Sequence, residues 1–166
     1  NMSVYYHTGM RDLFVGAICA IALFLFFYRG YDRWDEISAD LAGIFALGVA
    51  FFPTVEEGSW DWVAWVHFSS AACFLVILAL ISIFLFTRGE EYPSEMKRKR
   101  NFIYRACGII MLVSLAAVEV FFLFFGGINS DSGFVLIAET VILVAFGISW
   151  LTKGGTFYPD KLKKRV

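Results

Sequence analysis

Residues 102–126 read FIYRACGIIMLVSLAAVEVFFLFFG, and this stretch decides the fold class of the chain. Within its 25 residues the only charged side chains are those of Arg105 and Glu119. An α-helix needs about 20 predominantly apolar residues to cross the hydrocarbon core of a bilayer. The stretch therefore predicts a transmembrane helix.

The whole chain of 166 residues shares this apolar character, with 59% hydrophobic, 19% aromatic and only 17% charged residues. Soluble domains contain about 25% charged residues and about 45–50% apolar ones. The composition thus predicts an integral membrane protein with the lipid bilayer as its solvent. Residues 1–166 are expected to form a single all-α domain. A net charge of −1 gives no reason to expect a nucleic-acid partner.

Hydropathy read in windows of about 19 residues predicts five spans. Short breaks that contain Gly, Pro and charged residues separate them, so neighbouring helices are expected to be antiparallel. The predicted fold is a polytopic transmembrane helical bundle. The five spans are predicted at residues 11–28, 37–53, 62–87, 102–126 and 133–151.

The distribution of basic residues predicts the orientation of this bundle. If the breaks alternate between the two sides, one side collects 13 of the 14 Lys and Arg residues, and only Arg11 lies on the other. Cytoplasmic loops carry an excess of Lys and Arg. The amino end is therefore expected outside and the carboxyl end in the cytoplasm.

Two clusters of basic residues on the predicted cytoplasmic side could also contact anionic lipid headgroups, at about 1 kcal/mol per charge near the surface. The alternative interpretation is that they only set the topology. The clusters are Lys97, Arg98, Lys99 and Arg100, and Lys161, Lys163, Lys164 and Arg165.

Small residues recur at four-residue spacing in the first two predicted spans. Gly16 and Ala20 lie in the first span, and Ala42, Ala46 and Ala50 lie in the second. Such stripes let the backbones of membrane helices approach closely. We expect the two spans to pack through these residues, either within one chain or between two copies in an oligomer.

Ionisable residues inside membrane spans are candidate functional residues, because a charge near the bilayer centre costs about 2.5–3.5 kcal/mol even on insertion scales. His67, Glu119 and Glu139 stand on three different predicted spans. With a rise of about 1.5 Å per residue, all three lie roughly 10 Å below the outer face. Asp40 lies near the inner end, where it is expected to pair with a neighbouring Arg.

We predict an outward-facing site in which His67, Glu119 and Glu139 act as metal ligands or as acid and base. His and carboxylate groups suit a divalent cation that activates water, or a proton relay. Two His residues are too few for a pair of bis-His haems, so haem is not expected. The equal alternative is that the three residues only hydrogen-bond helices together. Further binding residues at the mouth of this site are His7, Arg11, Asp12 and Ser70.

Several short motifs are spread along most of the chain. They are Tyr5-Tyr6-His7-Thr8, Met10-Arg11-Asp12, Tyr28-Arg29-Gly30-Tyr31, Phe51-Phe52-Pro53-Thr54, His67-Phe68 and Gly147-Ile148-Ser149-Trp150-Leu151. Together these motifs resemble a family of bacterial six-span inner-membrane proteins of unknown function. The resemblance implies a helical bundle in the bacterial cytoplasmic membrane, and an additional span before the His7 segment. It implies no particular activity.

Three functions remain open on sequence grounds. The first is an outward-facing polar site that binds a small ligand, cation or lipid headgroup and extends to hydrolysis. The second is a proton- or ion-coupled transporter that uses the same carboxylates, although the chain shows none of the internal repeats of many carriers. The third is an accessory subunit of a larger membrane complex.

Overall fold

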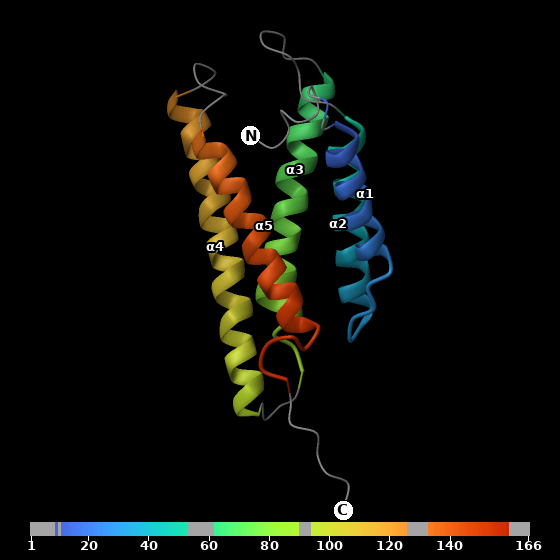
Figure 1. Cartoon of the computed structure of the whole chain (residues 1–166), viewed down its shortest axis with the longest axis vertical. Coiled ribbons are helices and arrows are strands. Elements are labelled where there is room, and N and C mark those ends of the chain that lie inside the picture. The colour runs from blue at the N-terminus through green and yellow to red at the C-terminus, as the bar shows by residue number, and fades with distance from the viewer. Residues whose placement is uncertain (1–8, 10, 53–61, 90–93, 126–132, 160–166) are drawn as a thin grey trace, which may run out of the picture.

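The structure is a computed structural model that describes residues 9, 11–52, 62–89, 94–125 and 133–159. All regular secondary structure in these residues is helical, which confirms the all-α prediction (Figure 1). The elements are α1 (Arg11–Phe26), α2 (Arg33–Phe51), α3 (Trp62–Leu80), the π-helix η2 (Ile81–Leu85), α4 (Glu95–Phe125) and α5 (Gly133–Lys153).

Three of these helices are long and apolar enough to cross a membrane. The first is the continuous helix formed by α3 and η2, with 24 residues. The second is 30 residues of α4, and the third is α5, with 21 residues. Helix α1 has 16 residues, or about 24 Å, which is shorter than the ~30 Å hydrocarbon core. Helix α2 has 19 residues but carries Asp35, Glu36 and Asp40 in its first half. Length and charge thus set α1 and α2 apart from the other predicted spans.

The helices are arranged as two groups joined through α3 (Figure 1). Helices α1 and α2 pack along each other, and α2 packs along α3. Helices α4 and α5 form the other closely packed pair, and α3 and η2 connect to α4. We call the end of the bundle at which α1 ends, α2 begins, η2 ends, α4 begins and α5 ends the basic end.

One main core receives buried side chains from every helix. Its members on α4, among them Tyr104 and Met111, extend from near the basic end to the middle of that helix, and its members on α5, Ile142 and Ala145, lie at the middle of α5. Val118, Val135 and Ala138 form a separate small cluster between α4 and α5 in the opposite halves. The two helix groups therefore share a core mainly towards the basic end.

Within one chain, the residues predicted for the seam between the first two spans are buried in α2 but not in α1. Ala42, Ala46 and Ala50 are fully buried, whereas Gly16 and Ala20 are exposed. A Cβ added at Gly16 would meet nothing within 4 Å. Helix α1 instead buries a different stripe of residues at helical spacing, which turns Gly16 and Ala20 away from α2. This stripe consists of Ile18, Ala22 and Leu25.

The π-helix η2 makes a polar junction between three helices. Its Ser82 is fully buried, and the Ser82 hydroxyl donates a hydrogen bond of 2.8 Å to the Tyr104 carbonyl of α4. The Ser149 hydroxyl of α5 lies 2.5 Å from the Ser82 hydroxyl and donates to it. Such π-turns within helices are rare and are frequently found at functional sites.

Candidate functional site at the basic end

The structure places His67 in a helix-packing role. His67 is fully buried in α3, and its Nδ1 lies 2.7 Å from the carbonyl oxygen of Phe52, just beyond the end of α2. In this contact Nδ1 donates and the carbonyl accepts. Ser70 is buried nearby against Gly48, where an added Cβ would lie only 2.5 Å from the Ser70 Oγ. His67 and Ser70 thus both face the α2–α3 interface.

The other residues of the predicted outward-facing site lie elsewhere. Glu119 is exposed on α4, Glu139 is half-buried on α5, and Arg11 and Asp12 are exposed at the start of α1. His7 lies outside the described residues. Among the residues that the structure describes, no three His, Cys, Asp or Glu side chains gather to hold a metal ion.

The structure therefore does not bring His67, Glu119 and Glu139 together as a ligand set. The physical reason is helix rotation, since His67 faces α2 while Glu119 is on an exposed face of α4. The number of residues between a side chain and the end of its span predicts the depth of that side chain in the bilayer, but it does not predict which neighbouring helix the side chain faces.

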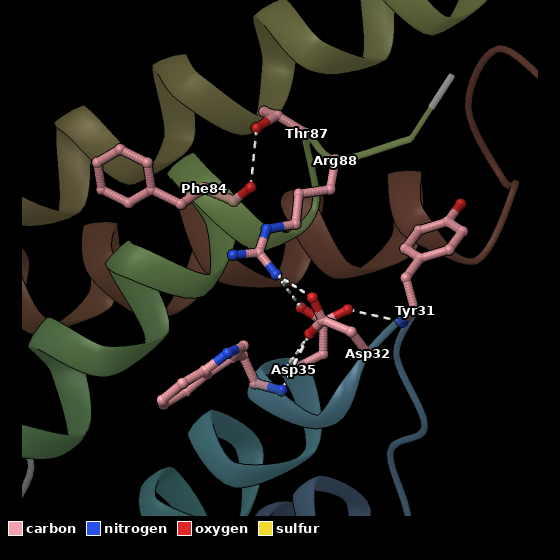
Figure 2. Close-up of polar contacts among 7 residues, drawn as sticks. Tyr31, Asp32, Asp35, Phe84, Thr87 and Arg88 are labelled. Carbon is pink, nitrogen blue, oxygen red and sulfur yellow. Dashed lines mark hydrogen bonds and ion pairs between the residues drawn. The ribbon is translucent and has the colours of Figure 1, made fainter. Parts of the chain in front are cut away.

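A different polar cluster lies at the basic end, where Asp32 caps α2. The Asp32 Oδ1 accepts hydrogen bonds from the backbone N–H groups of Trp34 at 2.9 Å and Asp35 at 3.1 Å. This is the usual way in which a side chain satisfies the free N–H groups at a helix start. The other oxygen, Oδ2, lies 2.7 Å from Arg88 Nη1, so the cap also anchors the segment after η2 (Figure 2).

Asp35 is the buried member of this cluster, with only 1% of its surface exposed. Its Oδ2 accepts a hydrogen bond of 2.6 Å from the Tyr31 N–H, and its Oδ1 lies 3.6 Å from Arg88 Nη1 (Figure 2). Gly30 makes room for it, because a Cβ there would overlap the Asp35 side chain. A buried carboxylate is costly unless it is paired, so Arg88 is its necessary counter-charge.

Two buried polar atoms in this cluster have unused hydrogen-bonding capacity. Within the described residues, neither Asp35 Oδ1 nor the Tyr28 hydroxyl has a hydrogen-bond partner. Tyr28 lies two residues beyond the end of α1, and a tyrosine phenol ionises only at about pH 10. The phenol consequently stays protonated and can donate a hydrogen bond.

Lys153, at the end of α5, brings a positive charge to the same place. Its Nζ lies 4.5 Å from the centre of the Tyr31 ring and 5.3 Å from that of Phe86, both within the range of cation–π attraction. No carboxylate in the described part of the chain forms an ion pair with Lys153. Lys97, in contrast, donates to the carbonyl oxygens of Phe86 and Arg88 at 3.2 and 2.9 Å.

Aromatic rings form the apolar side of the cluster. Tyr28 and Trp150 lie 5.3 Å apart between ring centres, Phe86 and Trp150 lie 5.8 Å apart, and Phe86 and Tyr104 lie 5.5 Å apart. These distances are typical of tilted and edge-to-face aromatic pairs. The site thus combines a buried carboxylate, a protonated phenol, an ammonium group and an aromatic wall.

The sequence interpretation selected the wrong acidic residues at this end. It expected Asp40 to pair with an Arg, whereas the ion pairs in the structure join Arg88 to Asp32 and Asp35. Asp40 is half-buried one turn further along α2. The spacing of Asp32 and Asp35 at a helix start is a capping signal that could have identified both residues.

Comparisons of the chain with protein-family models, with curated proteins and with solved structures gave no match. The geometry at the basic end therefore carries the functional argument.

Proposed function

We propose that the chain is a five-span protein of the bacterial cytoplasmic membrane, with its amino end outside and its carboxyl end in the cytoplasm. Three helices have the length and composition of membrane spans. Helix α1 packs along α2, and α2 packs along α3. This side-by-side packing supports the proposal that all three helices cross the same bilayer. Hydrogen bonds from the Phe27 N–H to the Leu23 carbonyl and from the Tyr28 N–H to the Leu25 carbonyl continue α1 by two residues.

We propose further that the protein binds a small polar ligand at the basic end. One observation carries this proposal. Lys153 lies near Asp35 and Tyr28 but forms no ion pair with a carboxylate in the described residues, and Asp35 Oδ1 and the Tyr28 hydroxyl are buried without a hydrogen-bond partner there. A network that served only to hold helices together would have its buried groups paired. Lys153 and the Tyr28 hydroxyl are available as hydrogen-bond donors, and Asp35 Oδ1 is available as an acceptor. This combination suits a ligand that has both acceptor and donor groups.

The chemistry of these groups defines the class of ligand. The Lys153 ammonium would bind a phosphate or carboxylate, and the Tyr28 hydroxyl would donate to the same anion. Asp35 Oδ1 would accept a hydrogen bond from a hydroxyl or amine of the ligand. The Arg88 side chain, 43% exposed, covers Asp35 from the aqueous side, and its rotation would admit the ligand. Glycerol phosphate and phosphoethanolamine have this combination of groups.

Thermal stability of the detergent-purified protein tests this proposal, with glycerol phosphate and phosphoethanolamine as probes. We expect at least one of them to raise the melting temperature, because a ligand that binds only the folded state stabilises it. Lys153→Gln should abolish the increase. Arg105→Gln removes an exposed charge elsewhere and should leave the increase unchanged.

Two outcomes contradict the proposal. If neither compound stabilises the protein, or if Lys153→Gln keeps the full increase, the site at the basic end does not bind this class. If His67→Ala abolishes the increase and Lys153→Gln does not, the ligand binds at the outward-facing site proposed around His67, Glu119 and Glu139.

A further inference from the structure

An open groove lies between the first turns of α4 and the segment that follows α5. It has a volume of about 550 Å³. Both basic and aromatic side chains contribute to its walls. The residues that line it are Glu95, Arg98, Lys99, Phe102, Ile103 and Tyr158.

A helix-ending motif builds one wall of this groove. Gly155 has a φ of +83°, and its N–H donates to the Thr152 carbonyl at 3.1 Å, while the Thr156 N–H donates to the Leu151 carbonyl at 3.1 Å. This pair of bonds is a Schellman motif, which ends α5 and reverses the chain. The segment then runs back beside α4.

Two contacts fix Tyr158 against α4. Arg100 Nη1 donates a hydrogen bond of 2.6 Å to the Tyr158 carbonyl oxygen, and Lys99 Nζ lies 5.9 Å from the centre of the Tyr158 ring. The aromatic wall of the groove is therefore held in place by the helix that forms its floor.

The charged and apolar residues of the groove are ordered along the axis of α4. Arg98 and Lys99 lie four residues, or about 6 Å, nearer to the helix start than Phe102 and Ile103. Helix α4 has 31 residues and is about 46 Å long, well beyond the ~30 Å hydrocarbon core. Its first turns therefore reach the headgroup region, with the cations outermost and Phe102, which is 75% exposed, directed towards the acyl chains.

The charges of the groove leave a net positive balance. Lys99 Nζ lies 3.0 Å from Glu95 Oε1, and both side chains are well exposed. Arg98 has no ion pair with any residue that the structure describes. A lysine ammonium has three donors, so Lys99 can contact Glu95 and an anion at the same time.

We infer that this groove binds one anionic phospholipid. The phosphate lies between Arg98 and Lys99, the upper part of an acyl chain lies over Phe102 and Ile103, and the Tyr158 ring flanks the glycerol region. The positive charge of the groove complements an anionic headgroup. The order of its lining residues along α4, with the cations outside the apolar residues, matches a lipid in the leaflet at the basic end. This inference is independent of the ligand proposed at Lys153, which rests on other residues.

Native mass spectrometry of the detergent-purified protein tests the inference with phosphatidylglycerol and phosphatidylcholine of equal chain length. We expect one phosphatidylglycerol to bind in preference to phosphatidylcholine. Arg98→Gln with Lys99→Gln should weaken its binding by about thirtyfold, as expected for the loss of two surface cations. The control pair, Arg33→Gln with Arg105→Gln, removes the same charge outside the groove and should weaken binding by less than threefold.

Three results would overturn the inference. Equal weakening by the two double variants would show general attraction rather than a site. Equal binding of phosphatidylcholine would show that the cations do not recognise the lipid. Displacement by glycerol phosphate at the concentration at which a short-chain phosphatidylglycerol competes would show that Phe102 and Ile103 do not contact an acyl chain. An unchanged melting temperature confirms that each variant is folded.

Discussion

The two ends of the bundle hold their helices together by different means. At the basic end, the main core is joined by the Arg88 ion pairs and the Ser82–Ser149 hydrogen bond, which link segments far apart in the sequence. At the opposite end, α4 and α5 meet in a small apolar cluster of Val118, Val135 and Ala138, and one hydrogen bond, from His67 Nδ1 to the Phe52 carbonyl, joins α3 to α2. Lipid is as apolar as the side chains of this cluster, so apolar contact specifies partners less sharply than polar contact does.

The polar contacts of the basic end thus specify which helices meet there, while the contact between α4 and α5 at the opposite end depends on close packing. Removal of the counter-charge of a buried carboxylate at the basic end should therefore cost the most, overpacking of a close helix contact should cost less, and removal of a single hydrogen bond should cost the least. The following three changes test this order, from the largest expected effect to the smallest.

Arg88→Ala should have the largest effect, because it leaves the buried Asp35 carboxylate without its counter-charge. Removal of one partner from a buried ion pair costs about 3–5 kcal/mol, and the partial exposure of Arg88 places the expected loss near the lower bound. The free energy of unfolding in mixed micelles measures it. Arg29→Ala is the control, since Arg29 lies 3.9 Å from Glu36 in an exposed pair that should contribute less than about 1 kcal/mol. Equal losses in the two variants would contradict the assignment of Arg88.

Gly48→Ala should have an intermediate effect at the α2–α3 interface. The added methyl group would lie 2.5 Å from Ser70 Oγ and 2.9 Å from Ser70 Cβ, so one helix must shift. Overpacking of this kind costs about 1–3 kcal/mol. Gly16→Ala is the matched control, and because its Cβ meets nothing, it should stabilise α1 by up to about 1 kcal/mol through helix propensity. The same denaturation assay compares them, and a destabilised Gly16→Ala would show that this face of α1 is covered.

Ser149→Ala should have the smallest effect of the three, about 1 kcal/mol, the usual contribution of one hydrogen bond. It removes the donor to Ser82 but leaves the bond from Ser82 to the Tyr104 carbonyl intact. Ser82→Ala removes both bonds and should cost more. A loss in Ser149→Ala that equals or exceeds that of Ser82→Ala would mean that Ser149 contributes something other than this hydrogen bond.

The sequence predicted the class of fold and the position of each helix, because both depend on the length of the apolar runs. It was less successful at helix ends. Helix α4 begins at Glu95 rather than near residue 102, since charged residues can continue a helix into water and hydropathy does not detect them. Helix α2 begins at Arg33 rather than at residue 37 for the same reason.

The candidate site could not be predicted because it depends on the direction in which each helix faces. Depth placed His67 and Glu119 at one level, yet one is fully buried and the other exposed. At the basic end, Asp35 and Asp40 are both acidic residues of α2, and only their helical phase decides which one is buried beside Arg88. Arg88 itself lies after η2, and only tertiary contact brings it to the start of α2.

The π-helix η2 changes the rotational phase of the continuous helix Trp62–Leu85, one of the helices long and apolar enough to cross a membrane. The Phe86 N–H donates to the Ile81 carbonyl, five residues back, so this turn holds one more residue than an α-turn. Helix α3 packs mainly along α2, whereas η2 packs more closely against α4 than against α2. One span can thus serve two different neighbours at two depths, without the proline or break in the helix that such a change of partner would otherwise require.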